Sequence, residues 1–119
     1  MVPSIFSQKA VDLYTNEDFY SLLTTSEYRK WKDGLRDRVA LRAISAREAR
    51  IAAGLFGDTK RIGDKVSELR VDVGPGYRIY FTIRGQKIVL LLIGGDKSSQ
   101  ESDIRKAKRM AEMEIEEEQ

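Results

Sequence analysis

The sequence has 119 residues, 41% of them hydrophobic and 34% charged, with a net charge of +2, which predicts a single globular domain over residues 1–119. It contains no cysteine and no histidine, which excludes disulfides and thiolate metal sites and removes the commonest general base and metal ligand. No signal peptide is recognisable and no apolar run is long enough to span a membrane, so we expect a cytoplasmic protein that needs no metal or other cofactor.

The charge is distributed unevenly along the chain. Residues 1–109 hold all 21 lysines and arginines and 14 of the 19 acidic residues, a net charge of +7, whereas residues 110–119 hold five acidic residues and no basic one. A basic body with an acidic end is typical of a protein that binds a polyanion. A well-solvated surface would explain the same charges without any partner.

The N-terminal third of the chain is predicted to contain one strand and one helix. Residues 10–14 read as a short strand, and residues 15–25 as a loop or a helical turn. Thr24 and Glu27 have the spacing of a capping box at the start of a helix, which Gly34 would end. One face of this helix carries Tyr28, Trp31 and Leu35, and the aromatic pair is expected to pack in the core rather than to stack on nucleic-acid bases.

A longer helix is predicted from about residue 37 to residue 53. Its apolar stripe contains Leu41, Ile44, Ile51 and Leu55, with Glu48 at a position that should be apolar. The same segment carries five arginines, which would suit either nucleic-acid phosphates, an acidic protein partner or plain solvation: Arg36, Arg38, Arg42, Arg47 and Arg50.

Three strands and a final helix are predicted after residue 65, where the apolar period changes from helical to alternating. The turn "GPG" lies between a strand ending near Val73 and a strand starting at Tyr77. Gly85-Gln86 form a second turn, which leads into "KIVLLLI". This last strand is apolar on both faces and is therefore predicted to be central. The segment "GGDKSSQ" is expected to leave the sheet. Ser98 and Glu101 have capping-box spacing, and the final helix should direct three side chains inward: Ile104, Ala107 and Ala111.

The predicted order is β-α-α-β-β-β-α. This order indicates an α+β fold in which a helical hairpin packs on a small, mainly antiparallel sheet that is followed by a C-terminal helix.

Two arginines stand out on the predicted sheet. If "GPG" alone forms the turn, Asp72 lies opposite Arg78 and Arg70 lies opposite Tyr80, all four on one face. The same register places Ile93 beside Arg78, so that the loop containing Lys97, Ser98 and Gln100 starts next to the arginines. Such a group of donors could bind a phosphate. A cross-strand ion pair between Arg78 and Asp72, worth ~0–1 kcal/mol, would account for the arginine equally well.

The segment from "LFGD" to "RKAK" resembles the RelE/ParE toxin superfamily, and in particular its HigB-like branch of addiction module killer or phage Gp49-like proteins. The resemblance spans roughly residues 26–109 and rests on the ordered pieces "FGD", "SELR", "GPGYRIYF" and "GGDKSSQ". Residues 1–25 and the acidic end at residues 110–119 match only loosely.

This resemblance implies the toxin of a type II toxin–antitoxin pair, neutralised by a cognate antitoxin of the HigA-like helix-turn-helix type. RelE- and HigB-type members cut mRNA on the ribosome by attack of a 2′-hydroxyl on the adjacent phosphate, whereas ParE-type members inhibit DNA gyrase. Both activities remain open for this chain, as does an inactive remnant that only binds an antitoxin.

The resemblance also implies roles for individual residues. Arg78 would stabilise the charge that develops on the phosphate, Arg70 would be a second cation on the preceding strand, and Lys97 would assist the leaving group. The candidate substrate-binding residues are Tyr80, Ser98, Gln100, Lys60 and Arg61. Several relatives carry a tyrosine or a histidine on the last helix, where this chain has Asp103. The identity of a general acid or base is therefore open, although electrostatic stabilisation alone supplies a large share of such catalysis.

Overall fold

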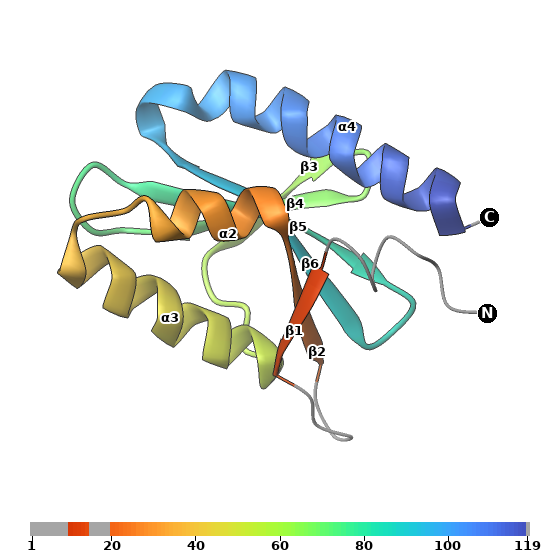
Figure 1. Cartoon of the computed structure of the whole chain (residues 1–119), viewed down its shortest axis with the longest axis horizontal. Helices are drawn as coiled ribbons and strands as arrows, with labels where there is room; N and C mark the ends of the chain where they lie inside the picture. The colour runs from red at the N-terminus through yellow and green to blue at the C-terminus, as the bar shows by residue number, and fades with distance from the viewer. Residues whose placement is uncertain (1–9, 15–19, 119) are drawn as a thin grey trace.

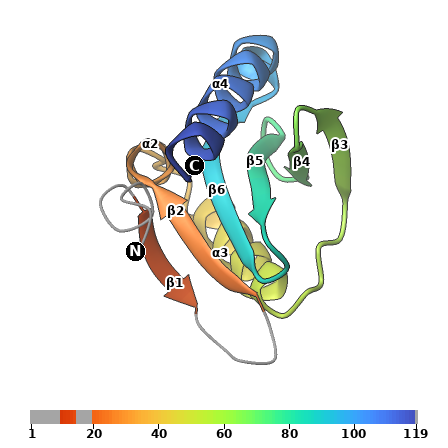
Figure 2. The ribbon, with the colours of Figure 1, turned by 90° about the vertical axis from the view of Figure 1, so that its right-hand side faces the viewer.

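A six-stranded sheet lies between helices on both of its faces in the computed structural model, which describes residues 10–14 and 20–118 (Figures 1 and 2). The strands are β1 (Ala10–Tyr14), β2 (Ser21–Thr25), β3 (Thr59–Gly63), β4 (Val66–Val71), β5 (Tyr77–Arg84) and β6 (Ile88–Asp96). The helices are α2 (Ser26–Asp33), α3 (Arg38–Ala52), the 3₁₀ turn η1 (Lys97–Ser99) and α4 (Gln100–Glu118). The strand order is β1-β2-β6-β5-β4-β3, and every neighbouring pair is antiparallel except β2–β6. The predicted α+β class is confirmed.

Two of the six strands were not predicted. The prediction of a loop or helical turn between the first strand and the first helix is wrong over Ser21–Thr25, because this segment is β2 and pairs in parallel with β6. Strand β3 has the sequence "TKRIG" and is almost entirely exposed, so it shows no alternation of apolar and polar residues. Both segments become strands through pairing with a neighbour, which a local pattern does not report.

The sheet separates two hydrophobic clusters. Helices α2 and α3 cover one face, where the fully buried side chains include Leu22, Tyr28, Ile44 and Ile79. Helix α4 covers part of the other face, where its Ala107 and Ala111 form a cluster with Tyr80, Leu90 and Leu92 of the sheet. Strand β6 contributes to both clusters, which confirms the prediction that it is central. Tyr28 and Trp31 pack in the first cluster, with ring centroids 5.6 Å apart.

The helix boundaries correct three predictions. The N-cap of α2 is Thr25 rather than Thr24, and the Thr25 hydroxyl accepts a hydrogen bond from the Tyr28 amide. Asp37 caps α3 as its predicted start implies, but Leu55 lies beyond the helix and is 58% exposed instead of buried. The predicted cap Ser98 is also wrong.

Ser98 lies inside the 3₁₀ turn η1, which Asp96 caps, and α4 follows from Gln100. Strand β6 continues through Gly94 and Gly95, and the Asp96 carboxylate then caps η1 by accepting a hydrogen bond from the Ser98 amide. The segment "GGDKSSQ" therefore leaves the sheet only after Asp96.

Glu48, unexplained by the sequence, is buried between α3 and α2. Its carboxylate accepts a hydrogen bond of 2.6 Å from the Tyr28 hydroxyl and one of 2.7 Å from the Lys32 ammonium. An acidic residue on the apolar stripe is therefore satisfied by two donors from the neighbouring helix.

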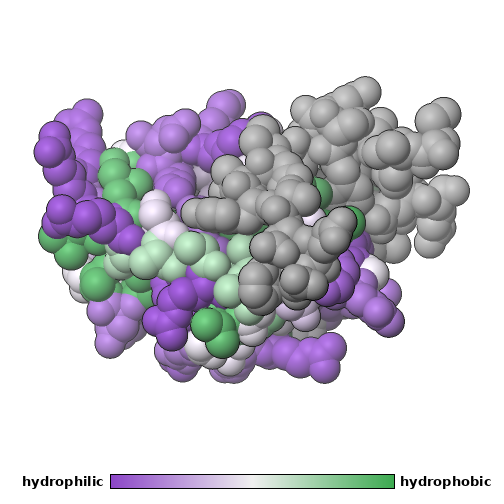
Figure 3. Space-filling model, turned by 90° about the horizontal axis from the view of Figure 1, so that it is seen from below, coloured by the Kyte–Doolittle hydropathy of each residue, from purple (hydrophilic) through white to green (hydrophobic). Residues whose placement is uncertain are grey.

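The surface seen from the α3 side carries hydrophilic side chains with apolar ones interspersed (Figure 3). Within residues 10–14 and 20–118, no helix is both long enough and apolar enough to cross a membrane.

Candidate functional site

Strands β4 and β5 place Arg70 directly opposite Arg78. The predicted register, with Asp72 opposite Arg78, is wrong by two residues. The strand ends at Val71, and the chain turns over residues 72–76, where the Gly76 amide donates to the Val73 carbonyl. Because the turn is longer than "GPG", the two arginines are cross-strand neighbours on the face that α4 partly covers. Like charges placed directly opposite each other repel, so this arrangement requires compensating contacts.

Strand β6 brings the third cation to the same place. Gly95, not Ile93 as predicted, lies opposite Arg78, because β6 includes both glycines and a bulge shifts the register after Tyr80. Lys97 follows two residues later, at the start of η1.

Arg70, Arg78 and Lys97 line one open pocket of about 400 Å³. Its other walls are Asp58, Val71 and the turn between β4 and β5, including Asp72, Gly74, Pro75, Gly76 and Tyr77. The predicted convergence of Arg70, Arg78 and Lys97 on one site is therefore a feature of the structure.

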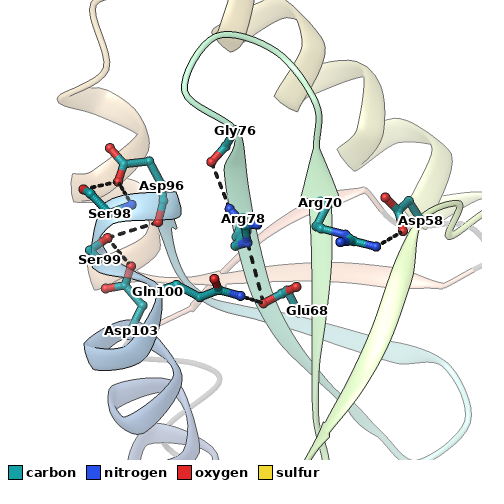
Figure 4. A network of polar contacts seen from close by, with 10 residues as sticks. All are labelled: Asp58, Glu68, Arg70, Gly76, Arg78, Asp96, Ser98, Ser99, Gln100 and Asp103. Atoms are coloured by element: carbon teal, nitrogen blue, oxygen red, sulfur yellow. Dashed lines mark hydrogen bonds and ion pairs between the residues drawn. The ribbon is translucent and has the colours of Figure 1, made fainter.

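Each arginine is held by its own carboxylate (Figure 4). The Arg70 guanidinium is half-exposed and lies 3.1 Å from Asp58 Oδ1. The Arg78 side chain is 12% exposed: its Nη1 donates to the Gly76 carbonyl over 3.3 Å, and its Nε lies 3.8 Å from Glu68 Oε1. The ion-pair partner of Arg78 is thus Glu68 instead of Asp72. The buried Nε has no hydrogen-bond partner among the described residues.

A second polar layer lies behind Arg78, under the start of α4. The Gln100 amide donates to Glu68 Oε1 over 2.9 Å, so Gln100 supports Glu68. The Glu68 side chain is 4% exposed, and its role was not predicted from the sequence. The sequence feature that could have pointed to it is an acidic residue that alternates with Leu69 on a strand face that is partly covered.

Tyr80 belongs to this second layer and not to the pocket surface. It is fully buried, and within the described part of the chain its hydroxyl makes no hydrogen bond of good geometry, although the Glu68 carboxylate lies close to it. Burial raises the pKa of Tyr80 far above its usual value, and the carboxylates of Glu68 and Asp103 raise it further. Tyr80 is therefore a neutral phenol that does not reach a substrate in the pocket, contrary to its predicted role.

The start of α4 is ordered by two hydroxyl–carboxylate contacts (Figure 4). Asp96 Oδ1 accepts from the Ser98 amide and hydroxyl, and these hydrogen bonds lower the pKa of Asp96. The Ser99 hydroxyl donates to Asp103 Oδ2 over 2.5 Å. Ser98 is exposed and lines a neighbouring hollow with Lys97 and Gln100, so it lies beside the arginine pocket rather than in it.

The structure does not bring Lys60 and Arg61 to the pocket. Both lie on β3, where Lys60 pairs with Glu68 and Arg61 with Ser67. Arg61 lines a hollow on the opposite face of the sheet, together with Phe81.

The pocket provides a setting for an anion. Three cations line an open space together with a glycine-rich turn; of the two acidic residues in the lining, Asp58 is already paired with Arg70, and Asp72 belongs to the turn. Guanidinium groups bind phosphate with paired hydrogen bonds, which suits a phosphodiester. The described residues contain no group of three or more acidic side chains that could hold a metal ion.

Two comparisons with known proteins give matches to this chain. Residues 27–113 match the family model of phage derived protein Gp49-like (DUF891). An uncharacterised protein of Haemophilus influenzae is 43% identical over 89 residues, which cover 75% of this chain and 90% of that protein.

Proposed function

We propose that this protein is a type II toxin that cleaves mRNA on the ribosome. The premise is that the chain belongs to the phage derived Gp49-like family, a family related to toxin–antitoxin systems. In this proposal the chain is a HigB-like member of the RelE/ParE superfamily. The observation that carries the proposal is the meeting of Arg70, Arg78 and Lys97 from three chain segments in one open pocket.

The proposed reaction is an internal phosphoryl transfer. The 2′-oxygen of a ribose forms a bond to the adjacent phosphorus, the bond from phosphorus to the 5′-oxygen of the next nucleotide breaks, and a 2′,3′-cyclic phosphate results. The 2′-hydroxyl gives up its proton to solvent, and the departing 5′-oxygen takes one from the Lys97 ammonium. Charge grows on the non-bridging oxygens in the transition state, where preorganised cations contribute most.

Arg78 is assigned the central role because of how it is held. Its side chain is mostly buried, fixed by the Gly76 carbonyl and Glu68, and its buried Nε has a donor without a partner in the described residues. A guanidinium that these contacts already hold in place needs little reorganisation to stabilise charge on a phosphate oxygen. Arg70 is half-exposed and would supply a second cation that adapts to the substrate.

The partners follow from the same proposal. The mRNA would be presented by the ribosome, and the net charge of +7 over residues 1–109 supports association with RNA. A cognate antitoxin of the HigA-like type would neutralise the protein.

Induced expression in cells tests the proposal. We expect the wild-type chain to arrest growth and to produce new mRNA ends within coding regions, whereas Arg78→Ala should produce neither. Arg109→Ala is the matched control, because Arg109 is exposed on α4 and lies outside the pocket. Growth arrest by Arg78→Ala equal to that of the wild type would contradict the site assignment.

Inhibition of DNA gyrase is the second candidate. The observation that favours it is Asp103, whose carboxylate accepts from Ser99 at the position where relatives with nuclease activity carry a tyrosine or a histidine. Unchanged transcript ends together with a DNA-damage response would favour this function. Absence of both effects, with binding to an antitoxin retained, would indicate an inactive remnant.

A further inference from the structure

The face of the sheet opposite Arg78 carries an open groove beside strand β3. The groove has a volume of about 600 Å³ and is not part of the candidate site. Its walls come from β3, β4, β5, the turn after β3 and the segment after α3, and the lining residues are Phe56, Thr59, Arg61, Lys65, Ser67, Phe81 and Ile83.

The floor of the groove is apolar and its rim is basic. Phe56 stacks on Phe81 with ring centroids 5.7 Å apart, and Ile83 is 41% exposed although it lies within a strand. Arg61 and Lys65 are both exposed, and among the described residues no acidic one lines the groove. An apolar floor within a basic rim fits a segment that carries apolar and acidic side chains.

Strand β3 supplies a backbone edge next to this groove. It is the last strand in the sheet order, so on one side it pairs with β4 and on the other it has no strand among the described residues. Its sequence, "TKRIG", contains two cations and no acid. Exposed strand edges bind extended peptides by adding a strand to the sheet.

From these features we propose that β3 and its groove bind an extended, acidic segment of a partner protein, which adds a seventh strand to the sheet and places an apolar side chain between Phe56 and Ile83. A second copy of the chain pairing edge to edge is disfavoured, because it would bring two basic β3 strands together. The inference rests on the proposed function in one respect: if the chain is a toxin, the partner segment belongs to its antitoxin.

The groove and the arginine pocket lie on opposite faces of the sheet. Arg61 pairs with Ser67 and Arg78 pairs with Arg70, and Ser67 and Arg70 are three residues apart on β4, so their side chains point to opposite faces. Occupation of the groove would therefore not fill the pocket directly. The cations of the pocket would stay open unless another part of the same partner protein reached them.

Binding of a labelled synthetic peptide that alternates glutamate and valine tests this inference on the full chain. Fluorescence anisotropy should show saturable binding, and the amide NMR signals of Thr59–Gly63 should shift. The same peptide with alternate N-methyl groups cannot pair with a strand, and a lysine–valine peptide has the wrong charge, so neither should bind. Equal binding of either control peptide would overturn the proposal.

Variants of the protein separate the charge from the apolar floor. Arg61→Glu combined with Lys65→Glu should weaken peptide binding by about tenfold or more, whereas Arg105→Glu combined with Arg109→Glu on α4 should leave it unchanged. Ile83→Lys adds a cation but removes the apolar floor, so it should also weaken binding. Tighter or unchanged binding to Ile83→Lys would overturn the proposed occupant.

Two further readouts distinguish competing outcomes. Concentration-dependent self-association of the wild-type chain, abolished by Arg61→Glu, would assign the groove to a second copy and overturn the proposal. If the wild-type chain binds the peptide but does not cleave mRNA, the proposed enzymatic function is refuted and the groove assignment stands.

Discussion

At Gly94 and Gly95, helices on the two faces of the sheet approach β6 closely. A Cβ atom added to Gly94 would overlap the indole ring of Trp31 from α2, and one added to Gly95 would overlap Asp103 Oδ2 of α4 and lie 2.8 Å from Ser99 Oγ. Replacement of either glycine by alanine should therefore destabilise the protein, although alanine is the smallest possible addition.

The structure sets the order of the two effects. The Trp31 ring is half-buried but packs between Tyr28 and Tyr77, with ring centroids 5.6 and 6.3 Å away, so that a shift of the ring would disturb both contacts. We expect Gly94→Ala to lower the free energy of unfolding by about 2–3 kcal/mol, at the upper end of overpacking effects. Asp103 is half-buried and can rotate away, which costs its hydrogen bond from Ser99. Gly95→Ala should therefore lower the free energy of unfolding by about 1–2 kcal/mol.

Gly34 provides the matched control. Its φ of −80° suits any residue, and an added Cβ would lie 3.4 Å from its nearest neighbour, the Lys30 carbonyl oxygen, which is an ordinary contact. Gly34→Ala should therefore be neutral or stabilise by ~0.4–1 kcal/mol, because alanine restricts the unfolded chain.

Urea unfolding followed by fluorescence measures all three variants, since Trp31 is the single tryptophan. In an Asp103→Ala background the overlap at Gly95 is largely removed, and Gly95→Ala should then cost much less. An equal loss in both backgrounds, or a loss for Gly34→Ala as large as that for Gly94→Ala, would refute the steric reasoning.

Three further predictions concern buried polar groups. Glu48→Ala should destabilise by about 3 kcal/mol and Glu48→Gln by less, in urea unfolding, because only alanine removes both acceptors used by Tyr28 and Lys32. Burial, and then Glu48, raise the pKa of Tyr28 above that of an unfolded tyrosine. The contribution of Tyr28 to the free energy of unfolding should therefore be fully present below pH 10 and fall above it by up to about 1.4 kcal/mol per pH unit. Tyr28→Phe should reduce that slope when urea unfolding is measured at a series of pH values. Tyr80→Phe should leave the unfolding free energy at pH 7 unchanged or raise it, because it removes a buried hydroxyl without a partner in the described residues; a clear loss would indicate a partner.

The sequence predicts those features that depend on local periodicity. The apolar stripe of α3, the two-sided burial of β6 and the face shared by Arg70 and Arg78 all follow from spacing along one element. The two-sided burial of β6 and the face shared by the two arginines are confirmed, whereas the α3 stripe is confirmed only at Ile44 and Ile51, because Leu41 is half-buried and Leu55 lies beyond the helix.

Features that depend on pairing between segments are not available from local pattern. The register of β4 and β5 differs from the prediction because Asp72 and Val73 join the turn, and β3 is a strand only because β4 lies beside it. In the sequence, Glu48 occupies a position that should be apolar, whereas Glu68 is one of the polar residues that alternate with apolar ones along a strand. Their partners, Lys32 and Arg78, are 16 and 10 positions away and are recognisable only in the folded chain.

The most direct measurement of the proposed roles of the pocket residues is cleavage of an mRNA programmed on purified ribosomes, with chemical identification of the ends. The account predicts a 2′,3′-cyclic phosphate on the upstream fragment and a loss of rate of at least about 10²-fold in Arg78→Ala, the scale of removing one preorganised donor to a transition-state oxyanion. Cleavage by Arg78→Ala at the wild-type rate, or wild-type products without a cyclic phosphate, would contradict it.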